Sequence, residues 1–313
     1  MDLKITQKIN QTTKKKYIFI SLMLLIPMAQ FAIFYVYMNM SNIILAFQGM
    51  NVDGSVYWLK DPLENFKYVL TGADSKIIFI SLKNNITMFF ITWFIGMPLN
   101  ILYGYYLFKK KAGHQVIRIL FMLPGMISGV GIAMLFMKFV EVGLPAFWQE
   151  AFGKVMPNLL RNNDTAFGVQ IVYSLWLGFS SSIIIYSNAM NAMDPEIFEA
   201  GRIDGTTNLT ELYYLVVPMM MPTLSTYIIT GFAGMLTASG SLFVFYGLNG
   251  VPEQANLLGY YLFQIAKNGV LEAYPRAAAT SLLMTVVTVP VTLLVRWILD
   301  KIDPMKDNYK GIA

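Results

Sequence analysis

The 313-residue chain contains no cysteine, a single histidine and few charges, since Lys, Arg, Asp and Glu together make up 13% of it. Without cysteine there are no disulfides, thiolate metal sites or cysteine nucleophiles. His114 lies among basic residues, and no cluster of His, Asp and Glu has the spacing of a metal site. No G-x-x-x-x-G-K-[ST] phosphate loop occurs either. We therefore expect no catalytic site, no metal site and no ATP bound by this chain.

Apolar residues are abundant in their place. They make up 56% of the chain, and the mean hydropathy is +0.54. The charged share of 13% is also about half of the roughly 25% found in soluble domains. A membrane-spanning helix needs roughly 20 mostly apolar residues. Six stretches qualify, at residues 17–38, 87–108, 116–139, 167–190, 216–245 and 277–298. We predict an all-α polytopic membrane protein with six transmembrane helices, the fifth long enough to include a re-entrant part.

The positions of the basic residues orient these helices. Lysines at 14–16 precede the first span, which we interpret as a retained signal anchor, and Lys109, Lys110 and Lys111 follow the second. Cytoplasmic connections carry such an excess. Both termini are therefore predicted to be cytoplasmic, with segment 1–16 and tail 299–313 flanking a membrane domain at 17–298. The connection 191–217 falls on the same side.

Ionisable residues are scarce inside the predicted spans, which disfavours a proton-coupled transporter and a channel with a ring of charges. Hydroxyl side chains are common in the fourth and fifth spans, and helix packing accounts for most of them. A substrate rich in hydroxyls, such as a sugar, would also suit them. The candidate residues of a substrate path are Ser174, Ser181, Thr230, Thr237 and Ser239.

The connection 191–217 carries detailed local signals. Asp194 can cap a helix that Pro195 begins, which predicts a short helix over residues 195–203. Gly205 can leave that helix with positive φ. Asn208 and Glu211 resemble a capping box for a second helix. Any connection needs caps and turns, so these signals alone do not decide between a plain connection and a docking site for a soluble partner.

The spacing of this connection is more specific than its capping signals. Glu199-Ala200-Gly201, then Asp204-Gly205 and later Val216-Val217-Pro218, closely resemble the EAA loop of binding-protein-dependent ABC transporter permeases. Gly201 stands where the family has Ala. Further landmarks resemble those of sugar permeases and extend the resemblance over residues 17–301, namely Leu63-Glu64-Asn65-Phe66, Asn84-Asn85, residues 109–113 and Leu123-Pro124.

The resemblance implies the type I ABC importer permease fold and a bacterial cell membrane location. It also implies that segment 194–205 is a coupling helix that enters a groove on a cytoplasmic ATPase. The coupling residues would be Glu199, Ala200, Gly201, Asp204, Gly205 and Pro218. The implied partners are two ATP-binding subunits that hold ATP and Mg²⁺, a second and different permease subunit, an extracytoplasmic solute-binding protein and membrane lipid, with no nucleic acid.

The resemblance further implies a carbohydrate or oligosaccharide cargo. Two alternatives stay open from the residues. One is an ABC permease for another solute, such as a peptide, an amino acid or an anion, although few buried basic residues are available for an anion. The other is a secondary transporter or channel that works alone.

Overall fold

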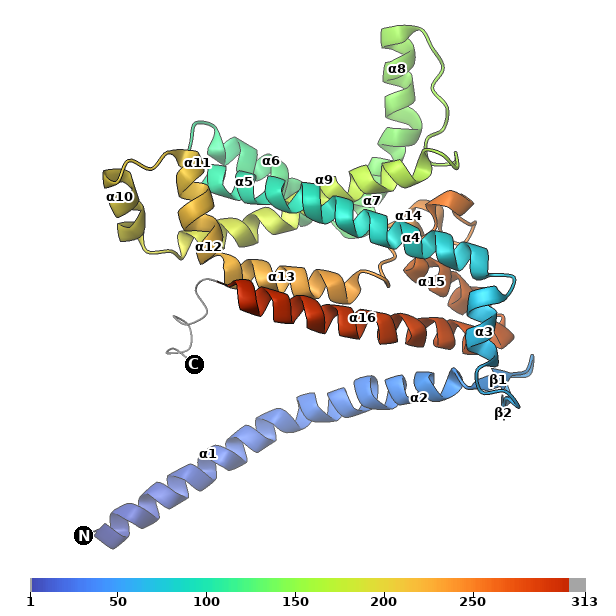
Figure 1. The fold of residues 1–313 in the computed structure, drawn as a ribbon, viewed down its shortest axis with the longest axis horizontal. Helices are drawn as coiled ribbons and strands as arrows, with labels where there is room; N and C mark the ends of the chain where they lie inside the picture. The colour runs from blue at the N-terminus through green and yellow to red at the C-terminus, as the bar shows by residue number, and fades with distance from the viewer. Residues whose placement is uncertain (1, 304–313) are drawn as a thin grey trace. The chain divides into compact units, whose positions relative to one another are not determined.

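The computed structural model describes residues 2–303, with the side chains of residues 2–15 and of Ser181 outside the description. Most of the predicted tail 299–313 therefore lies outside the described residues. The chain forms two compact units, one of residues 1–67 with 271–282 and one of residues 68–270 with 283–313. Helices dominate both units, as predicted (Figure 1).

The first unit begins with a long helix. It consists of α1 (Asp2–Gln30), the π-helical η1 (Phe31–Tyr37) and α2 (Met38–Leu45), and its residues Lys16–Leu45 are long and apolar enough to span a membrane. The polar residues that precede this span belong to the same helix, because α1 already begins at Asp2. Hydropathy marks where a span can begin, but it does not mark where a helix begins.

A small hairpin and a capped helix complete the first unit. Strands β1 (Gln48–Met50) and β2 (Val56–Trp58) pair antiparallel, with Gly49 opposite Tyr57. The buried Asn65, at the start of α3 (Glu64–Thr71), donates from Nδ2 to the carbonyl oxygens of Ala46 at 3.0 Å and Gln48 at 2.9 Å. The short η6 (Leu271–Ala273) contacts β1.

The second unit is a helical bundle in which α9 packs against both α5 and α6 (Figure 1). Its first half contains α4 (Ser75–Ile91), η2 (Thr92–Gly96), α5 (Met97–Phe108), α6 (His114–Met126), α7 (Gly129–Lys138), η3 (Phe139–Gly143), α8 (Leu144–Phe152) and α9 (Ala166–Asn191). Its second half contains α10 (Pro195–Ile203), α11 (Asn208–Glu211), η4 (Leu212–Val216), α12 (Val217–Met219), α13 (Met221–Gly234), α14 (Leu242–Tyr246), η5 (Glu253–Ala255) and α15 (Leu258–Asn268). Helix α16 (Tyr274–Ile302) begins in the first unit and ends in the second.

Five helices in the described residues can span a membrane by length and composition, and a bent pair raises the number to six. The prediction of one continuous span at 116–139 is wrong. Ile127 and Ser128 adopt extended backbone between α6 and α7, and the qualifying helix there is Gly129–Phe152. Gly125 lies just before this break. A Cβ at this position would overlap the Ser180 hydroxyl, so the missing side chain lets α6 approach α9 closely.

The predicted span at 216–245 is also not one helix. Helices Asn208–Met219 and Met221–Gly234 meet at a 68° bend. Pro222 follows the bend and has no N–H to donate to the preceding turn, which accounts for the interruption. Helix α13 then ends at Gly234, and α14 follows a short irregular segment.

Two adjacent asparagines of α4 hold irregular backbone in place: Asn85 bonds to the segment between α13 and α14, and Asn84 bonds to the segment between α14 and α15. The Nδ2 of Asn84 donates to the carbonyl oxygens of Gln254 at 2.8 Å and Asn256 at 2.9 Å. The Nδ2 of Asn85 lies 3.2 Å from the carbonyl oxygens of two further residues, Met235 and Ala238, and its Oδ1 accepts from the N–H of Leu258 at 3.1 Å. Both asparagines are buried. They supply hydrogen bonds to backbone groups that have no helical partner in an apolar environment.

The Asn85→Ala variant tests this role. Removing the amide leaves buried backbone groups unpaired, so we expect the free energy of unfolding to fall by about 1–3 kcal/mol. Denaturant titration of the purified protein in detergent micelles measures it. Asn188→Ala is the matched control, because Asn188 is an exposed asparagine on α9. Equal stability of the two variants would contradict the proposed bridge.

Candidate functional site

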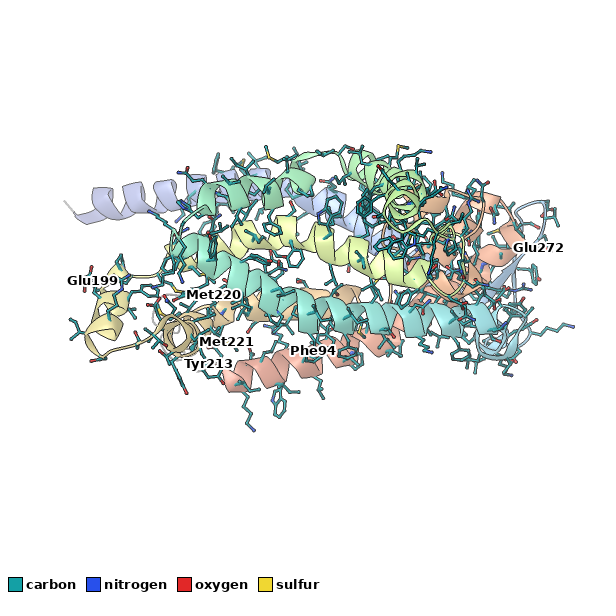
Figure 2. All side chains as sticks on the ribbon, turned by 90° about the horizontal axis from the view of Figure 1, so that it is seen from above. Phe94, Glu199, Tyr213, Met220, Met221 and Glu272 are labelled. Carbon is teal, nitrogen blue, oxygen red and sulfur yellow. The ribbon has the colours of Figure 1, made fainter. Side chains whose placement is uncertain are left out.

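The connection 191–217 folds as its capping signals predict. Helix α10 spans Pro195–Ile203, and the Asp194 side chain accepts from the N–H of Glu196 at 3.0 Å. Gly205 has a φ of 81°, a left-handed conformation that strains any residue with a side chain. The predicted helix and turn are therefore confirmed. Glu199 lies on α10, at the same end of the second unit as Tyr213 and Met220 (Figure 2).

A close approach explains the glycine at position 201. Gly201 is buried, and a Cβ there would lie 2.9 Å from Cδ1 of Leu215 and 3.2 Å from Oγ1 of Thr206. Thr206 also donates to the Gly201 carbonyl oxygen, from its N–H at 3.0 Å and from its hydroxyl at 2.8 Å. The missing side chain lets the end of α10 lie against the segment that follows it.

The predicted capping box at Asn208 and Glu211 is wrong. Thr207 caps α11, with extended backbone, and its N–H donates to the Thr210 hydroxyl at 2.7 Å. The box therefore begins one residue earlier and uses Thr210 in place of an acidic residue. Glu211 has another role, because its side chain is buried.

Glu211 forms a buried ion pair. Its side chain is 3% exposed, and its Oε1 pairs with Nζ of Lys109, whose side chain is 11% exposed. The Tyr105 hydroxyl donates to the same oxygen at 3.0 Å. A buried carboxylate is tolerated when it is both paired and hydrogen-bonded. The pair joins the end of α5 to the end of α11.

Aromatic rings enclose the ammonium group of Lys109. Its Nζ lies 5.4 Å from the ring centroid of Tyr105, 5.8 Å from that of Phe108 and 5.6 Å from that of Phe198. Phe108 and Phe198 also pack against each other, with centroids 5.1 Å apart. Since Phe198 belongs to α10, the Lys109–Glu211 cluster (Lys109, Glu211, Tyr105, Phe108 and Phe198) connects α10 with α5 and α11.

The opposite face of α10 is exposed. Phe198 and Gly201 are its buried residues, whereas Ile203 is 87% exposed. The structure also leaves exposed the sequence-predicted residues Glu199, Ala200, Asp204 and Gly205. Pro218 does not join them: it lies half-buried in α12, directly after the π-helical η4. The exposed face of α10 therefore combines one large apolar side chain with charged ones.

A small polar cavity lies within the bundle. It has a volume of about 170 Å³, and Ser174 from α9 is one of its lining residues. Asn100 from α5 lines it as well, is 6% exposed, and has a side-chain oxygen without a hydrogen-bond partner. Sequence reasoning missed Asn100, although an amide inside an apolar run was a visible signal. The remaining polar lining comes from Thr92, Ser182, Tyr186 and Tyr227.

Of the other predicted path residues, Thr230, Thr237 and Ser239 do not line this cavity. The Thr230 hydroxyl donates to the Thr226 carbonyl oxygen at 2.8 Å on its own helix. Thr237 lines a separate cavity of about 220 Å³ together with Thr288. Ser239 is exposed in the irregular segment after α13. The side chain of Ser181 lies outside the described residues.

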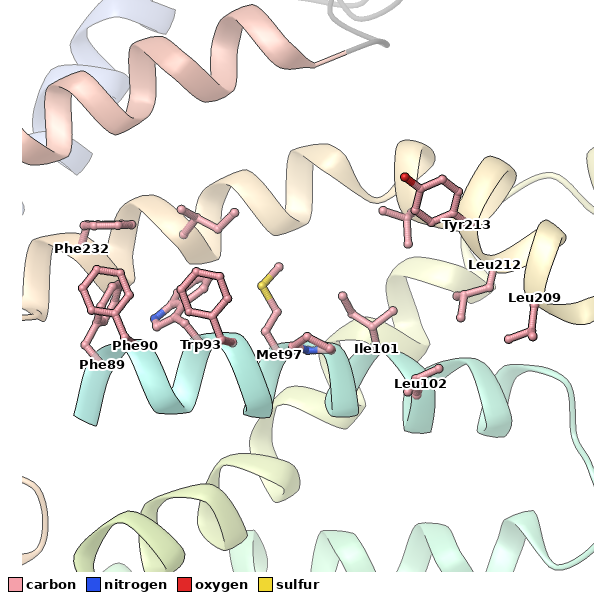
Figure 3. A pocket seen from close by; sticks show the side chains of 14 residues that line it. Phe89, Phe90, Trp93, Met97, Ile101, Leu102, Leu209, Leu212, Tyr213 and Phe232 are labelled. Atoms are coloured by element: carbon pink, nitrogen blue, oxygen red, sulfur yellow. The ribbon is translucent and has the colours of Figure 1, made fainter. Parts of the chain in front are cut away.

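An apolar groove of about 720 Å³ lies between α4–α5 and α11–α13. Figure 3 shows Phe89, Phe90, Trp93 and Met97 from one wall facing Phe232 from the other. Its lining also includes Leu209 and Tyr213 near α10. Such a surface offers few hydrogen bonds to a solute rich in hydroxyls, so its size does not make it the substrate path.

The sequence of this chain is similar to those of known transport proteins. The profile of a family described as "Binding-protein-dependent transport system inner membrane component" matches residues 96–307. The multiple sugar-binding transport system permease protein MsmF of Streptococcus mutans is 25% identical over 232 residues, which cover 73% of this chain and 78% of MsmF. The polygalacturonan/rhamnogalacturonan transport system permease protein YteP of Bacillus subtilis is 25% identical over 213 residues, covering 66% and 64%. The maltose/maltodextrin permease protein MalF of Escherichia coli is 25% identical over 191 residues, which span 58% of this chain but 36% of MalF.

Solved structures share the fold. The crystal structure of a bacterial ABC transporter involved in the import of the acidic polysaccharide alginate aligns with a TM-score of 0.77 at 18% identity, covering 93% of this chain and 98% of that one. A second structure, of the alginate transporter in complex with an alginate pentasaccharide-bound periplasmic protein, aligns with the same TM-score at 16% identity, covering 94% and 98%. The all-α importer permease fold expected from the sequence is therefore confirmed.

Glu211→Ala tests the Lys109–Glu211 cluster. The change leaves the Lys109 charge buried without a partner, so we expect the free energy of unfolding to fall by about 3–5 kcal/mol in detergent. Replacing both residues by leucine should recover much of this loss, because no unpaired charge then remains. Glu196→Ala, which removes an exposed carboxylate from α10, is the control. A Glu211→Ala variant as stable as that control would contradict the buried pair.

Proposed function

Because this chain belongs to the family of binding-protein-dependent transport system inner membrane components, we propose that it is the permease subunit of an ATP-driven bacterial importer for a carbohydrate or oligosaccharide. It is a multi-pass protein of the cell membrane. The names of three relatives, MsmF, YteP and MalF, support a sugar cargo, as does the alginate transporter that shares the fold.

The observation that carries the mechanism is the two-sided character of α10. Its inner side packs into the Lys109–Glu211 cluster, and its outer side exposes Glu199, Ala200 and Ile203. We propose that this outer side docks into a groove on an ATP-binding subunit, which holds ATP and Mg²⁺. The basic connection after α5 lies beside α10, which supports a cytoplasmic position for this end. From the basic residues that precede the first span and the even number of predicted spans, we propose that both termini are cytoplasmic too.

The proposed assembly contains two ATP-binding subunits, a second and different permease, and an extracytoplasmic solute-binding protein. The periplasmic protein in one of the solved alginate transporter structures supports the last of these. Movement of the ATPases would reach the bundle through α10 as a rigid-body motion, since packed helices support such switching.

We propose that the substrate path includes the polar cavity around Asn100 and Ser174. Sugars present both hydroxyls and apolar C–H faces. The cavity combines amide and hydroxyl groups with the aromatic side chains of Trp93 and two tyrosines, Tyr186 and Tyr227. The unpartnered oxygen of Asn100 is available to accept a hydrogen bond from a substrate hydroxyl.

Uptake into proteoliposomes tests the function. The chain is reconstituted with its partner permease, ATPase and solute-binding protein, and a panel of labelled oligosaccharides is offered with and without ATP inside. We expect ATP-dependent accumulation of at least one sugar. Accumulation without ATP would favour a transporter that works alone, and tight binding of a non-sugar solute with no sugar uptake would refute the carbohydrate assignment.

The same assay examines the polar cavity. In the Asn100→Ala variant we expect a raised KM for uptake with unchanged ATPase association, because the lost amide contacts substrate rather than the ATPase. Thr230→Ala is the control, since that hydroxyl bonds to its own helix. Equal KM values for the two variants would remove Asn100 from the path.

Gly205→Leu tests the turn after α10. A left-handed conformation costs a residue with a side chain about 1–2 kcal/mol, so the turn should distort and uptake should be lost while membrane insertion persists. Gly153→Leu is a matched control, because Gly153 has a φ of 66° and, like Gly205, has no atom near its added Cβ, but it ends α8. Full substrate-stimulated ATPase activity in Gly205→Leu would contradict the coupling role.

A further inference from the structure

A further pocket opens beside α10 and shares Glu199 with the docking face. It has a volume of about 370 Å³ and lies between α10 and the ends of α5 and α9. Its charged lining consists of Lys109, Lys110, Glu199 and Arg202, and its remaining lining residues are Phe108, Asn191, Met193, Pro195 and Phe198.

The charges of this pocket are unbalanced. Lys109 is neutralised by Glu211. Lys110 and Arg202 are exposed, and neither forms an ion pair or a side-chain hydrogen bond within the described residues. Glu199 contributes one negative charge. Two unpaired cations therefore face the pocket against one carboxylate.

The backbone holds Lys110 in an unusual conformation. Its φ is 47°, which is costly for a residue other than glycine. The turn is maintained from both sides: the N–H of Lys110 donates to the Leu107 carbonyl oxygen at 3.1 Å, and the Tyr106 hydroxyl donates to the carbonyl oxygen of Ala112. The backbone of Lys110 is thus held at the rim of the pocket.

We propose that this pocket receives an acidic side chain of the ATP-binding subunit, with the carboxylate between Lys110 and Arg202. The inference rests on the proposed function, which brings that subunit to α10. A guanidinium group can bind a carboxylate through two parallel hydrogen bonds. The pocket would then give the docking its orientation, while Ile203 on the adjacent face supplies apolar contact.

A protein carboxylate fits these residues better than a lipid phosphate. Glu199 lines the same pocket, and its charge repels any incoming anion, a carboxylate as well as a lipid phosphate. A partner surface can instead place an acid near the two cations and a base near Glu199. Because the groups are exposed, the attraction affects association rate and salt dependence strongly.

Zero-length crosslinking of the intact complex tests the proposal. A carbodiimide joins a lysine amine to a carboxylate only where the two are in contact. We expect a link from Lys110 to an Asp or Glu of the ATP-binding subunit, identified by mass spectrometry of the purified transporter. Lys110→Arg keeps the charge and should keep the complex while losing the link. Lys111, an exposed neighbour outside the pocket, is the internal control.

A binding measurement makes the test independent of crosslinking yield. Arg202→Glu should weaken association with the ATP-binding subunit about tenfold at low salt and less at high salt, whereas Arg202→Lys should retain most of the affinity. Unchanged affinity in Arg202→Glu, or links from Lys111 in place of Lys110, would overturn the proposal. If Arg202→Glu weakened the binding of the ATP-binding subunit in phosphatidylglycerol vesicles but not in phosphatidylcholine vesicles, the pocket would be assigned to lipid. That result would also overturn the proposal.

The outcomes separate this inference from the proposed function. If the wild-type chain binds no ATP-binding subunit at all, the proposed function fails, and the pocket proposal fails with it. If the wild-type complex forms and transports, but the Lys110 and Arg202 variants behave like it, only the pocket proposal fails.

Discussion

The buried ion pair between Lys109 and Glu211 is the interaction on which this end of the protein depends. A carboxylate in apolar surroundings is stable only while its partner stays in place, so the pair fixes the distance between α5 and α11. Phe198 adds α10 to the same cluster by covering the lysine. Helix α5 and the neighbouring helices α10 and α11, about 100 residues further along the chain, are therefore held at one point, and none of them can move without disturbing a buried charge.

This arrangement places a tightly packed end of the second unit next to a bend in the chain. Beyond Glu211 the chain passes through the π-helical η4 and then bends by 68° near Met220. Pro218 and Pro222 lie on either side of the bend, where their missing N–H groups weaken the helical ladder. A displacement of α10 is therefore passed through the buried pair to α11 and on to the bend that precedes α13.

Capping and turn residues in the sequence correctly predicted the features that depend on neighbouring residues. The bounds of α10 followed from Asp194 and Pro195, and the positive φ of Gly205 followed from the end of the helix. The same reasoning was wrong for Glu211. Its spacing from Asn208 fits a capping box, but its side chain is buried against a lysine about 100 residues away. Hydropathy found the apolar runs but not the breaks near residues 127 and 220, since a broken helix can be as apolar as a continuous one. The substrate path was predicted from hydroxyl content alone, and of that set Ser174 is the one described side chain that lines the polar cavity.

The polar cavity has to widen before a sugar can pass through it. At about 170 Å³ it is smaller than the roughly 300 Å³ at which ligand pockets begin, so a sugar can pass only after its walls separate. Helices α5 and α9 are held together where Gly104 lies against Tyr186, since a Cβ on this glycine would be 3.1 Å from the tyrosine Cβ. The third wall contributes Tyr227 from α13, the helix that follows the bend. Helix α13 is itself held close to η2, since a Cβ on Gly231 would be 2.3 Å from the Trp93 ring. It is, however, the wall connected through α12 and α11 to the Lys109–Glu211 cluster, so a displacement of α10 has a route through it to the proposed substrate path.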